Sequence, residues 1–119
     1  MKKVMVVDDE QDTLELVGMA LKTGGYDVVT ASSGKECLEK LETDKPDFII
    51  LDMKMPEMDG EETLKKIRAK DAKIPVAFLS AVKISPAQDM ILTAEYNIRG
   101  YLFKPITKSE LLARLREII

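Results

Sequence analysis

The sequence predicts an α/β fold in which helices cover both faces of a parallel five-stranded sheet. Short apolar runs alternate with segments of helical periodicity, and this strand–helix pair occurs five times. The third run, Phe48-Ile49-Ile50-Leu51, is apolar at consecutive positions, as expected of a strand that is buried on both faces. Because 119 residues with 45% hydrophobic content suffice for one core, we expect a single domain over residues 1–119.

The first half of the chain predicts three strands and two helices. An apolar run forms the first strand, and Gly24-Gly25 ends the helix that follows it. Ser33–Glu36 fits a capping box that opens the second helix, and Pro46 ends that helix. The expected elements, in order, are strand 4–7, a helix with Leu14, Val17 and Leu21 on one face, strand 27–31, a helix with Leu38 and Leu41, and strand 47–51.

The second half predicts two more strands and three helices, each helix opened by a capping residue. Asp59-Gly60, Ser85-Pro86 and Thr107 fit the start of a helix. The expected elements are a helix with Leu64 and Ile67 facing inward, strand 75–79, a helix whose apolar side is Met90, Ile91 and Ala94, strand 100–103, and a helix with Leu111, Leu112, Leu115 and Ile118.

Composition excludes several classes of function. A net charge of −3 gives no broad electrostatic reason to bind nucleic acid or an anionic membrane, and 5% aromatic residues without Trp argue against a base-stacking surface. The run at residues 4–7 is too short for a membrane span. One cysteine, Cys37, excludes an internal disulfide and suits a reducing cytoplasm. The absence of His removes the usual general base and zinc ligand.

Polar residues follow four of the five strands directly. Asp8 and Asp9 follow the first strand, Asp52 the third, Ser80 the fourth and Lys104 the fifth. The carboxyl ends of parallel strands share one edge of the sheet, where ligands bind. In the doubly wound, flavodoxin-like (βα)5 order 2-1-3-4-5, the first and third strands are neighbours, so Asp8, Asp9 and Asp52 should form one pocket.

Three carboxylates in one pocket predict a bound cation. Two carboxylates about 5 Å apart repel by roughly 3 kcal/mol at an effective dielectric constant near 20. A cation or an added proton is therefore needed. Because the ligands are all oxygen, Mg²⁺ is expected before Ca²⁺.

A magnesium-bound carboxylate, a hydroxyl and an ammonium group together favour a phosphoryl group as the ligand. Asp52 could act as the nucleophile and form an acyl phosphate. Magnesium and Lys104 would balance the added charge, and Ser80 would donate a hydrogen bond. Taken alone, Ser80 would be a strand-end hydroxyl bonded to the backbone, and Tyr101 would be a half-buried packing residue.

Four ordered motifs resemble the receiver domain of two-component response regulators, the CheY-like family. They are VMVVDDE (4–10), DFIILDMKMPEMDG (47–60), VAFLSA (76–81) and GYLFKP (100–105), and they cover essentially the whole chain. Ser80 stands where Thr is commoner in that family, and the segment from Ser80 to Lys104 is slightly long. The resemblance implies roles for eight residues: Asp8 and Asp9 in the acidic pocket, Asp52 as phosphoacceptor, the Lys54 carbonyl as a further metal ligand, Ser80 as switch hydroxyl, Tyr101 as switch aromatic, Lys104 as phosphate-binding lysine, and Pro105 after a cis peptide bond.

The resemblance also implies partners and output. A sensor histidine kinase or phosphotransfer protein would donate the phosphoryl group, and a protein target would bind the face of the fourth helix, fifth strand and fifth helix. The domain itself would contact neither nucleic acid nor membrane. It would be cytoplasmic, with self-catalysed phosphotransfer and slow autodephosphorylation instead of true enzymatic turnover.

Alternative functions are a magnesium-dependent phosphatase with an aspartyl nucleophile, a flavin or nucleotide carrier, and a receiver that acts without phosphorylation. The dehalogenase-type phosphatase site requires an acid two residues after the nucleophile, where this chain has Lys54. Acids follow the first strand where a carrier requires a phosphate-binding loop. The five main site residues disfavour an unphosphorylated receiver. Since the sequence ends after the fifth helix, a stand-alone receiver is expected in place of a fragment.

Overall fold

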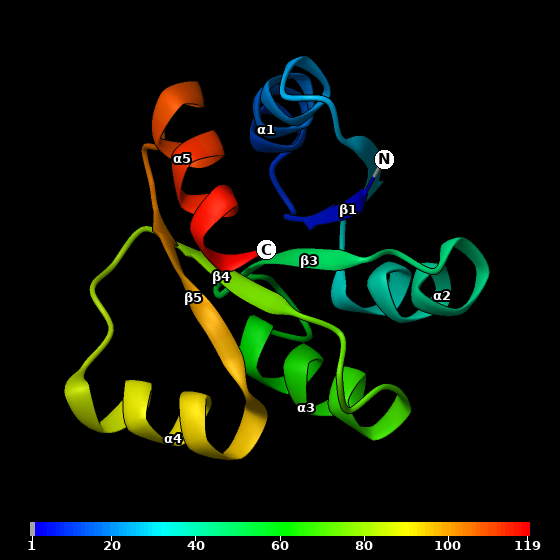
Figure 1. The fold of residues 1–119 in the computed structure, drawn as a ribbon. Coiled ribbons are helices and arrows are strands. Elements are labelled where there is room, and N and C mark those ends of the chain that lie inside the picture. Colours follow the sequence, from blue (N-terminus) through cyan, green and yellow to red (C-terminus); the bar gives the residue numbers. More distant parts are fainter. Residues whose placement is uncertain (1) are drawn as a thin grey trace.

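The computed structural model describes residues 2–119 and confirms the predicted fold class. The sheet is parallel, and its strand order is β2-β1-β3-β4-β5 (Figure 1). Strands and helices alternate along the chain: β1 (Lys3–Val7), α1 (Gln11–Thr23), β2 (Asp27–Ala31), α2 (Gly34–Asp44), β3 (Phe48–Asp52), α3 (Gly60–Lys70), β4 (Val76–Ser80), α4 (Pro86–Tyr96), β5 (Ile98–Phe103) and α5 (Lys108–Ile118).

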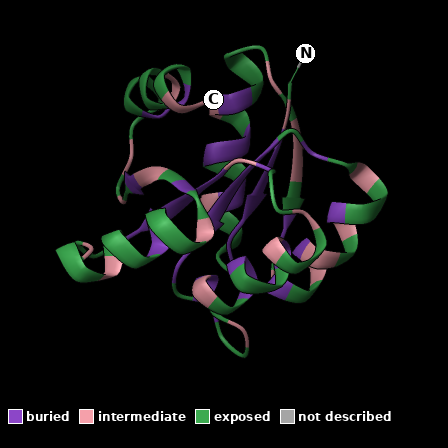
Figure 2. Ribbon diagram, turned by 60° about the horizontal axis from the view of Figure 1, so that its bottom comes forward, coloured by how far each residue is buried: buried purple, intermediate pink, exposed green. Residues whose placement is uncertain are grey.

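Helices cover both faces of the sheet. α1 and α5 lie on one face, and α2, α3 and α4 lie on the other (Figure 1). Each face has its own apolar cluster, with Leu21 and Leu115 in the first and Leu64 and Ile67 in the second. The central strands are buried, while the outer sides of the helices are exposed (Figure 2). No helix within residues 2–119 is long and apolar enough to cross a membrane.

The predicted capping residues open four of the helices. The side chains of Ser33, Asp59, Ser85 and Thr107 each accept a hydrogen bond from the backbone N–H three residues later. Each of these bonds satisfies one of the donors that a helix leaves free at its first turn. Local sequence therefore determines where these helices begin.

The predicted apolar side of α4 is wrong. Met90 and Ile91 are 71% and 51% exposed, and Ala94 is also exposed. The helix instead buries Leu92 and packs Tyr96, four residues later, against the same cluster. Positions four apart lie on one side of a helix, so this pair turns Met90 toward solvent.

β5 begins two residues earlier than predicted. Val76 pairs with Ile98 and Ala77 with Gly100, so the pairing skips Arg99 through a bulge. Ile98 is buried in the core, which explains why the strand extends past Gly100.

Strand register brings the polar residues to one edge. Val7 pairs with Leu51, so Asp8 follows β1 at the level where Asp52 ends β3. Ser80, the last residue of β4, pairs with Phe103, the residue before Lys104. Polar residues from four places in the sequence therefore reach the same end of the sheet.

Candidate functional site

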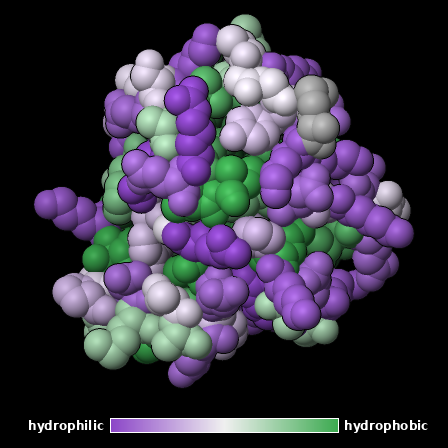
Figure 3. Space-filling view, viewed as in Figure 1, coloured by the Kyte–Doolittle hydropathy of each residue, from purple (hydrophilic) through white to green (hydrophobic). Residues whose placement is uncertain are grey.

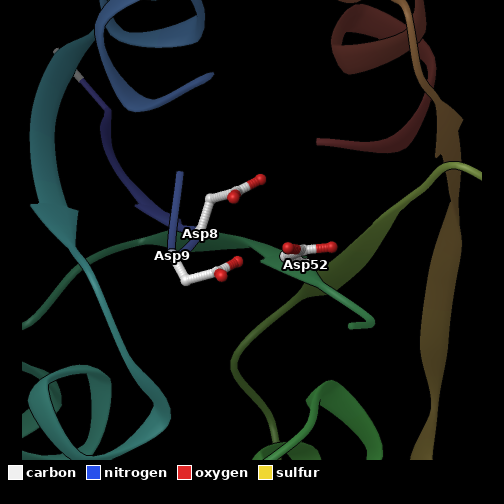
Figure 4. Close-up of side chains that lie close together, drawn as sticks. All are labelled: Asp8, Asp9 and Asp52. Carbon is white, nitrogen blue, oxygen red and sulfur yellow. The ribbon is translucent and has the colours of Figure 1, made fainter. Parts of the chain in front are cut away.

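Three carboxylates converge beyond the ends of β1 and β3. One oxygen from each of Asp8, Asp9 and Asp52 lies within 4.8 Å of the others. Figure 4 shows the three side chains pointing into a shared space, Asp8 and Asp9 from the end of β1 and Asp52 from the end of β3. Asp8 and Asp52 are buried, whereas Asp9 is exposed.

Asp8 has one oxygen with a hydrogen bond and one without. Its Oδ1 accepts a hydrogen bond of 2.9 Å from the backbone N–H of Glu10. Its Oδ2 is buried and forms an ion pair with the Lys104 ammonium at 2.9 Å, but accepts no hydrogen bond of good geometry from residues 2–119. A buried carboxylate oxygen needs a positive charge nearby, and here the Lys104 ammonium supplies one.

The surroundings of Asp52 raise the pKa of its carboxyl group. Its Oδ1 accepts a hydrogen bond of 3.3 Å from the Lys54 backbone N–H. Burial, followed by the charge of Asp8, raises the pKa of Asp52 to about 6, against the opposing effects of the Lys54 N–H and Lys104. Two buried carboxylates that repel each other are the physical cause.

Lys104 is the cation of the site. Its Nζ lies 2.9 Å from Asp8 Oδ2, 3.3 Å from Glu10 Oε1 and 3.6 Å from Asp52 Oδ2. Burial acts to lower the pKa of Lys104, but the carboxylates of Asp8, Asp52 and Glu10 outweigh it and raise that pKa. The ammonium group is thus charged and lies closer to Asp8 than to Asp52.

Sequence reasoning missed Glu10 as a partner of Lys104. The sequence assigned no role to Glu10, which is the N-cap residue of α1. Its position two residues after Asp8, at the same edge of the sheet, was the available signal.

The hydroxyl groups of Ser80 and Tyr101 form hydrogen bonds outside the acidic cluster. The Ser80 hydroxyl donates to the Val82 carbonyl at 2.6 Å and accepts from the Val82 N–H at 3.1 Å. The Tyr101 hydroxyl donates to Asp89 Oδ1 on α4 at 2.9 Å. Asp89 was also missed by the sequence reasoning, because nothing in the sequence indicates which residues of α4 face β5.

The loops around the site are fixed by backbone contacts. The Lys104 N–H donates to the Ser80 carbonyl at 2.7 Å, and the Lys104–Pro105 peptide bond is cis. Gly60 N–H donates to the Met53 carbonyl at 3.0 Å. A Cβ atom on Gly60 would lie 2.7 Å from Met53 Cα, so only glycine fits there.

The residues present fit a hard divalent cation. The donors are carboxylate oxygens, one of which is buried without a hydrogen bond, and their mutual repulsion falls when a cation binds. The predicted fourth ligand, the Lys54 carbonyl, belongs to the residue whose N–H bonds Asp52. Its role as a metal ligand stays a prediction.

Comparison with known proteins identifies a receiver-domain family model and relatives that are transcriptional regulatory proteins. The family model described as "Response regulator receiver domain" matches residues 4–116. The chain is 40% identical over 118 residues to the alkaline phosphatase synthesis transcriptional regulatory protein PhoP of Bacillus subtilis, covering 99% of this chain and 48% of PhoP. It is 37% identical over 117 residues to the transcriptional regulatory protein PrrA of Mycobacterium tuberculosis, covering 98% and 49%. The chain therefore spans about half the length of these relatives.

A solved structure also resembles this chain in its fold. The chemotaxis protein CheY4 of Vibrio cholerae, crystallised at low pH, superposes with a TM-score of 0.92 at 33% sequence identity. The match covers 100% of this chain and 99% of CheY4. The likeness extends over the whole sheet and all of its flanking helices.

Proposed function

The chain belongs to the response regulator receiver domain family of two-component systems, and we propose on that premise that it is a phosphorylation-controlled switch with Asp52 as phosphoacceptor. One observation carries the proposal. Asp52 lies 3.6 Å from the Lys104 ammonium and within 4.8 Å of the Asp8 and Asp9 carboxylates, so a nucleophile, a cation and a metal-ligand set share one pocket.

We propose that Asp8, Asp9, Asp52 and the Lys54 carbonyl hold Mg²⁺. When bound, the ion would offset the negative charge that gathers as a phosphoryl group approaches the carboxylates. The close approach of the three carboxylates supports this assignment, because one oxygen from each lies within 4.8 Å of the others.

Asp52 would accept the phosphoryl group by direct attack. A carboxylate oxygen of Asp52 forms a bond to phosphorus, and the phosphorus–nitrogen bond of a phosphohistidine donor breaks, leaving the electron pair on the imidazole. With a pKa of about 6, Asp52 is mostly ionised at neutral pH and able to attack. Lys104 needs to shift little to contact the phosphoryl oxygens.

The donor would be a sensor histidine kinase or a phosphotransfer protein. The acidic cluster lies at the edge of the sheet, where Asp9 is exposed, so a partner's phosphohistidine has access to it. The named relatives are transcriptional regulators of about twice this length. For this domain we propose contact with proteins only, in the cytoplasm, and no contact with DNA or membrane.

The output would arise at the face formed by α4, β5 and α5. Ser80 and Tyr101 each form a hydrogen bond that would have to break if the side chain moved. Ser80 bonds to its own loop, and Tyr101 bonds to α4. A phosphoryl group on Asp52 would attract the Ser80 hydroxyl, and Tyr101 would move into the space that Ser80 leaves. A downstream protein would then distinguish the two states at this face.

The chain would act as a switch and not as a phosphatase. The residue two positions after Asp52 is Lys54, and a lysine there cannot protonate a leaving group in the way a carboxylic acid does. Slow hydrolysis of the acyl phosphate is the expected return step.

The test is phosphorylation by acetyl phosphate, followed by intact mass spectrometry. We expect the wild-type protein to gain one phosphoryl group in the presence of Mg²⁺ and to lose it in acid or base. The Asp52→Asn variant should gain none, while Asp47→Asn, at an exposed carboxylate before β3, should label as wild type does. Equal labelling of Asp52→Asn would overturn the proposal.

A further inference from the structure

A hydrogen bond between side chains links Tyr101 to α4. Its hydroxyl donates to Asp89 Oδ1 at 2.9 Å, and the Thr93 hydroxyl donates to the same oxygen at 3.1 Å. Asp89 is therefore oriented by a second residue of its own helix, one turn further along. The carboxylate is in place to accept from Tyr101 without further rearrangement.

The Tyr101 ring packs against two other aromatic rings. Phe78 on β4 and Phe103 on β5 stack with it at centroid distances of 6.3 and 6.4 Å. The ring itself is half-buried. The hydroxyl bond to Asp89 links this stacked ring to α4.

There is space beside this ring for it to move. Tyr101, Asp89 and Val82 line one pocket of about 590 Å³. Val82 is also the residue whose backbone holds the Ser80 hydroxyl. The resting contacts of Ser80 and of Tyr101 thus meet at the same pocket.

The first turn of α4, which carries Asp89, is largely exposed. Among the described residues, Leu92 is the buried side chain of this helix. Its C-terminal end is held by Arg68, which donates to the Tyr96 carbonyl at 2.8 Å. Its first turn is held to α3 through the side chains of Gln88 and Glu61. The Asp89–Tyr101 bond is a direct polar link from this turn to β5.

We propose that Asp89 is a positioning residue that holds Tyr101 in its resting place and so limits how readily the phosphorylated state forms. The inference rests on the proposed function, because it requires Tyr101 to move when Asp52 is modified. Moving Tyr101 away from α4 breaks the bond to Asp89. Each molecule therefore loses one hydrogen bond on entering the active state.

The expected change in affinity follows from the fraction of molecules in the active state. The apparent affinity for a ligand that binds only the active state scales with the fraction of molecules in that state. Removing one hydrogen bond of ordinary net strength from the resting state raises that fraction by about twofold to tenfold. The same change should appear in the affinity for an analogue of the phosphoryl group.

The experiment titrates the protein with beryllofluoride, a tetrahedral analogue of the phosphoryl group, at saturating Mg²⁺, and follows amide NMR shifts. We expect Asp89→Ala to bind about twofold to tenfold more tightly than wild type. Asp89→Asn, which keeps an uncharged acceptor of the same shape, should lie between the two. In Asp89→Ala without ligand, the Tyr101 ring signals should move toward their ligand-bound positions.

Two controls separate the hydrogen bond from general effects of the helix. Glu95→Ala removes an exposed carboxylate elsewhere on α4 and should leave the affinity within about twofold of wild type. In a Tyr101→Phe background, Asp89→Ala should have no further effect on affinity. An effect of Asp89→Ala that persists in that background would overturn the inference.

The outcomes for the function and for the inference are distinct. If wild type fails to bind beryllofluoride with Mg²⁺, the proposed function is wrong and the inference falls with it. If wild type binds beryllofluoride and both Asp89 variants bind it with the same affinity as wild type, only the inference is wrong.

Discussion

Asp52 shows why an apolar strand ends in an acid. The strand Phe48–Asp52 is buried at every residue, and burying a carboxylate beside another one is unfavourable. The unfavourable interaction is visible in the raised pKa of Asp52, whose causes are burial and the charge of Asp8. Such a site is stable only when a cation or a proton balances the charge, which is the property that a metal-dependent phosphoacceptor needs.

The raised pKa of Asp52 predicts a particular dependence of stability on pH. The pKa rises from 3.8 in the unfolded chain to about 6 in the fold, so the folded state binds the proton more tightly. Without divalent cations, the contribution of Asp52 to folding becomes less favourable as pH rises from about 4 to about 6. It then stays constant, at a loss of about 3 kcal/mol.

The measurement compares urea unfolding of wild type and Asp52→Asn across this pH range. The stability of Asp52→Asn relative to wild type should grow between pH 4 and 6. Mg²⁺ at pH 7 should stabilise wild type and leave Asp52→Asn nearly unchanged. A difference between the two proteins that is flat with pH would contradict the assigned environment of Asp52.

At this scale, the sequence predicts the charged residues of the site better than their hydrogen bonds. Asp8, Asp52 and Lys104 were predictable because each directly follows a strand, and strand ends share an edge. The bond from Tyr101 to Asp89 was not predictable, because it depends on how α4 is rotated against β5. Propensity and periodicity do not determine such a rotation.

α4 depends on a few polar contacts for its position. It buries Leu92, and its C-terminal end is fixed by Arg68 of α3. The Arg68 guanidinium also donates to the Ile74 carbonyl at 2.6 Å and, at 3.3 Å each, to the carbonyls of Asp71 and Asn97. Burial lowers the pKa of Arg68, which fits a cation whose partners are mainly carbonyl oxygens.

Replacing Arg68 should therefore destabilise the protein strongly. Arg68→Met keeps the apolar stem but leaves four backbone carbonyls without their donor, and we expect a loss of about 2–4 kcal/mol in the free energy of unfolding. Lys66→Met, which removes only an exposed pair with Glu62 on the same helix, should cost less than about 0.5 kcal/mol. Equal urea midpoints for the two variants would show that Arg68 does not anchor α4.

Local sequence signals predicted that each helix and strand exists. They did not predict the buried side of α4 or the bulge in β5. Helix starts followed from Ser33, Asp59, Ser85 and Thr107, each of which caps as expected. The buried side of α4 was mispredicted because Met90, Ile91 and Leu92 are all apolar and sequence does not say which faces the sheet. The bulge at Arg99 arises from pairing with β4, a contact between distant residues.

At the scale of the whole molecule, the apolar core and the acidic cluster occupy different places. Two apolar clusters, one on each face, hold the strands, and the acidic cluster occupies one edge beyond them. Much of the face viewed in Figure 3 is hydrophilic, with apolar side chains visible in places. Charge changes at the edge can therefore occur without disrupting either core.

The most direct test of the account is to locate the phosphoryl group chemically. Borohydride reduces an acyl phosphate to an alcohol, so a phosphorylated aspartate becomes homoserine, which peptide mass spectrometry can place in the sequence. After treatment with acetyl phosphate and Mg²⁺, we predict homoserine at position 52 alone, and none when Mg²⁺ is removed. Homoserine at position 8 or 9, or unmodified Asp52 after full phosphorylation, would contradict the central claim.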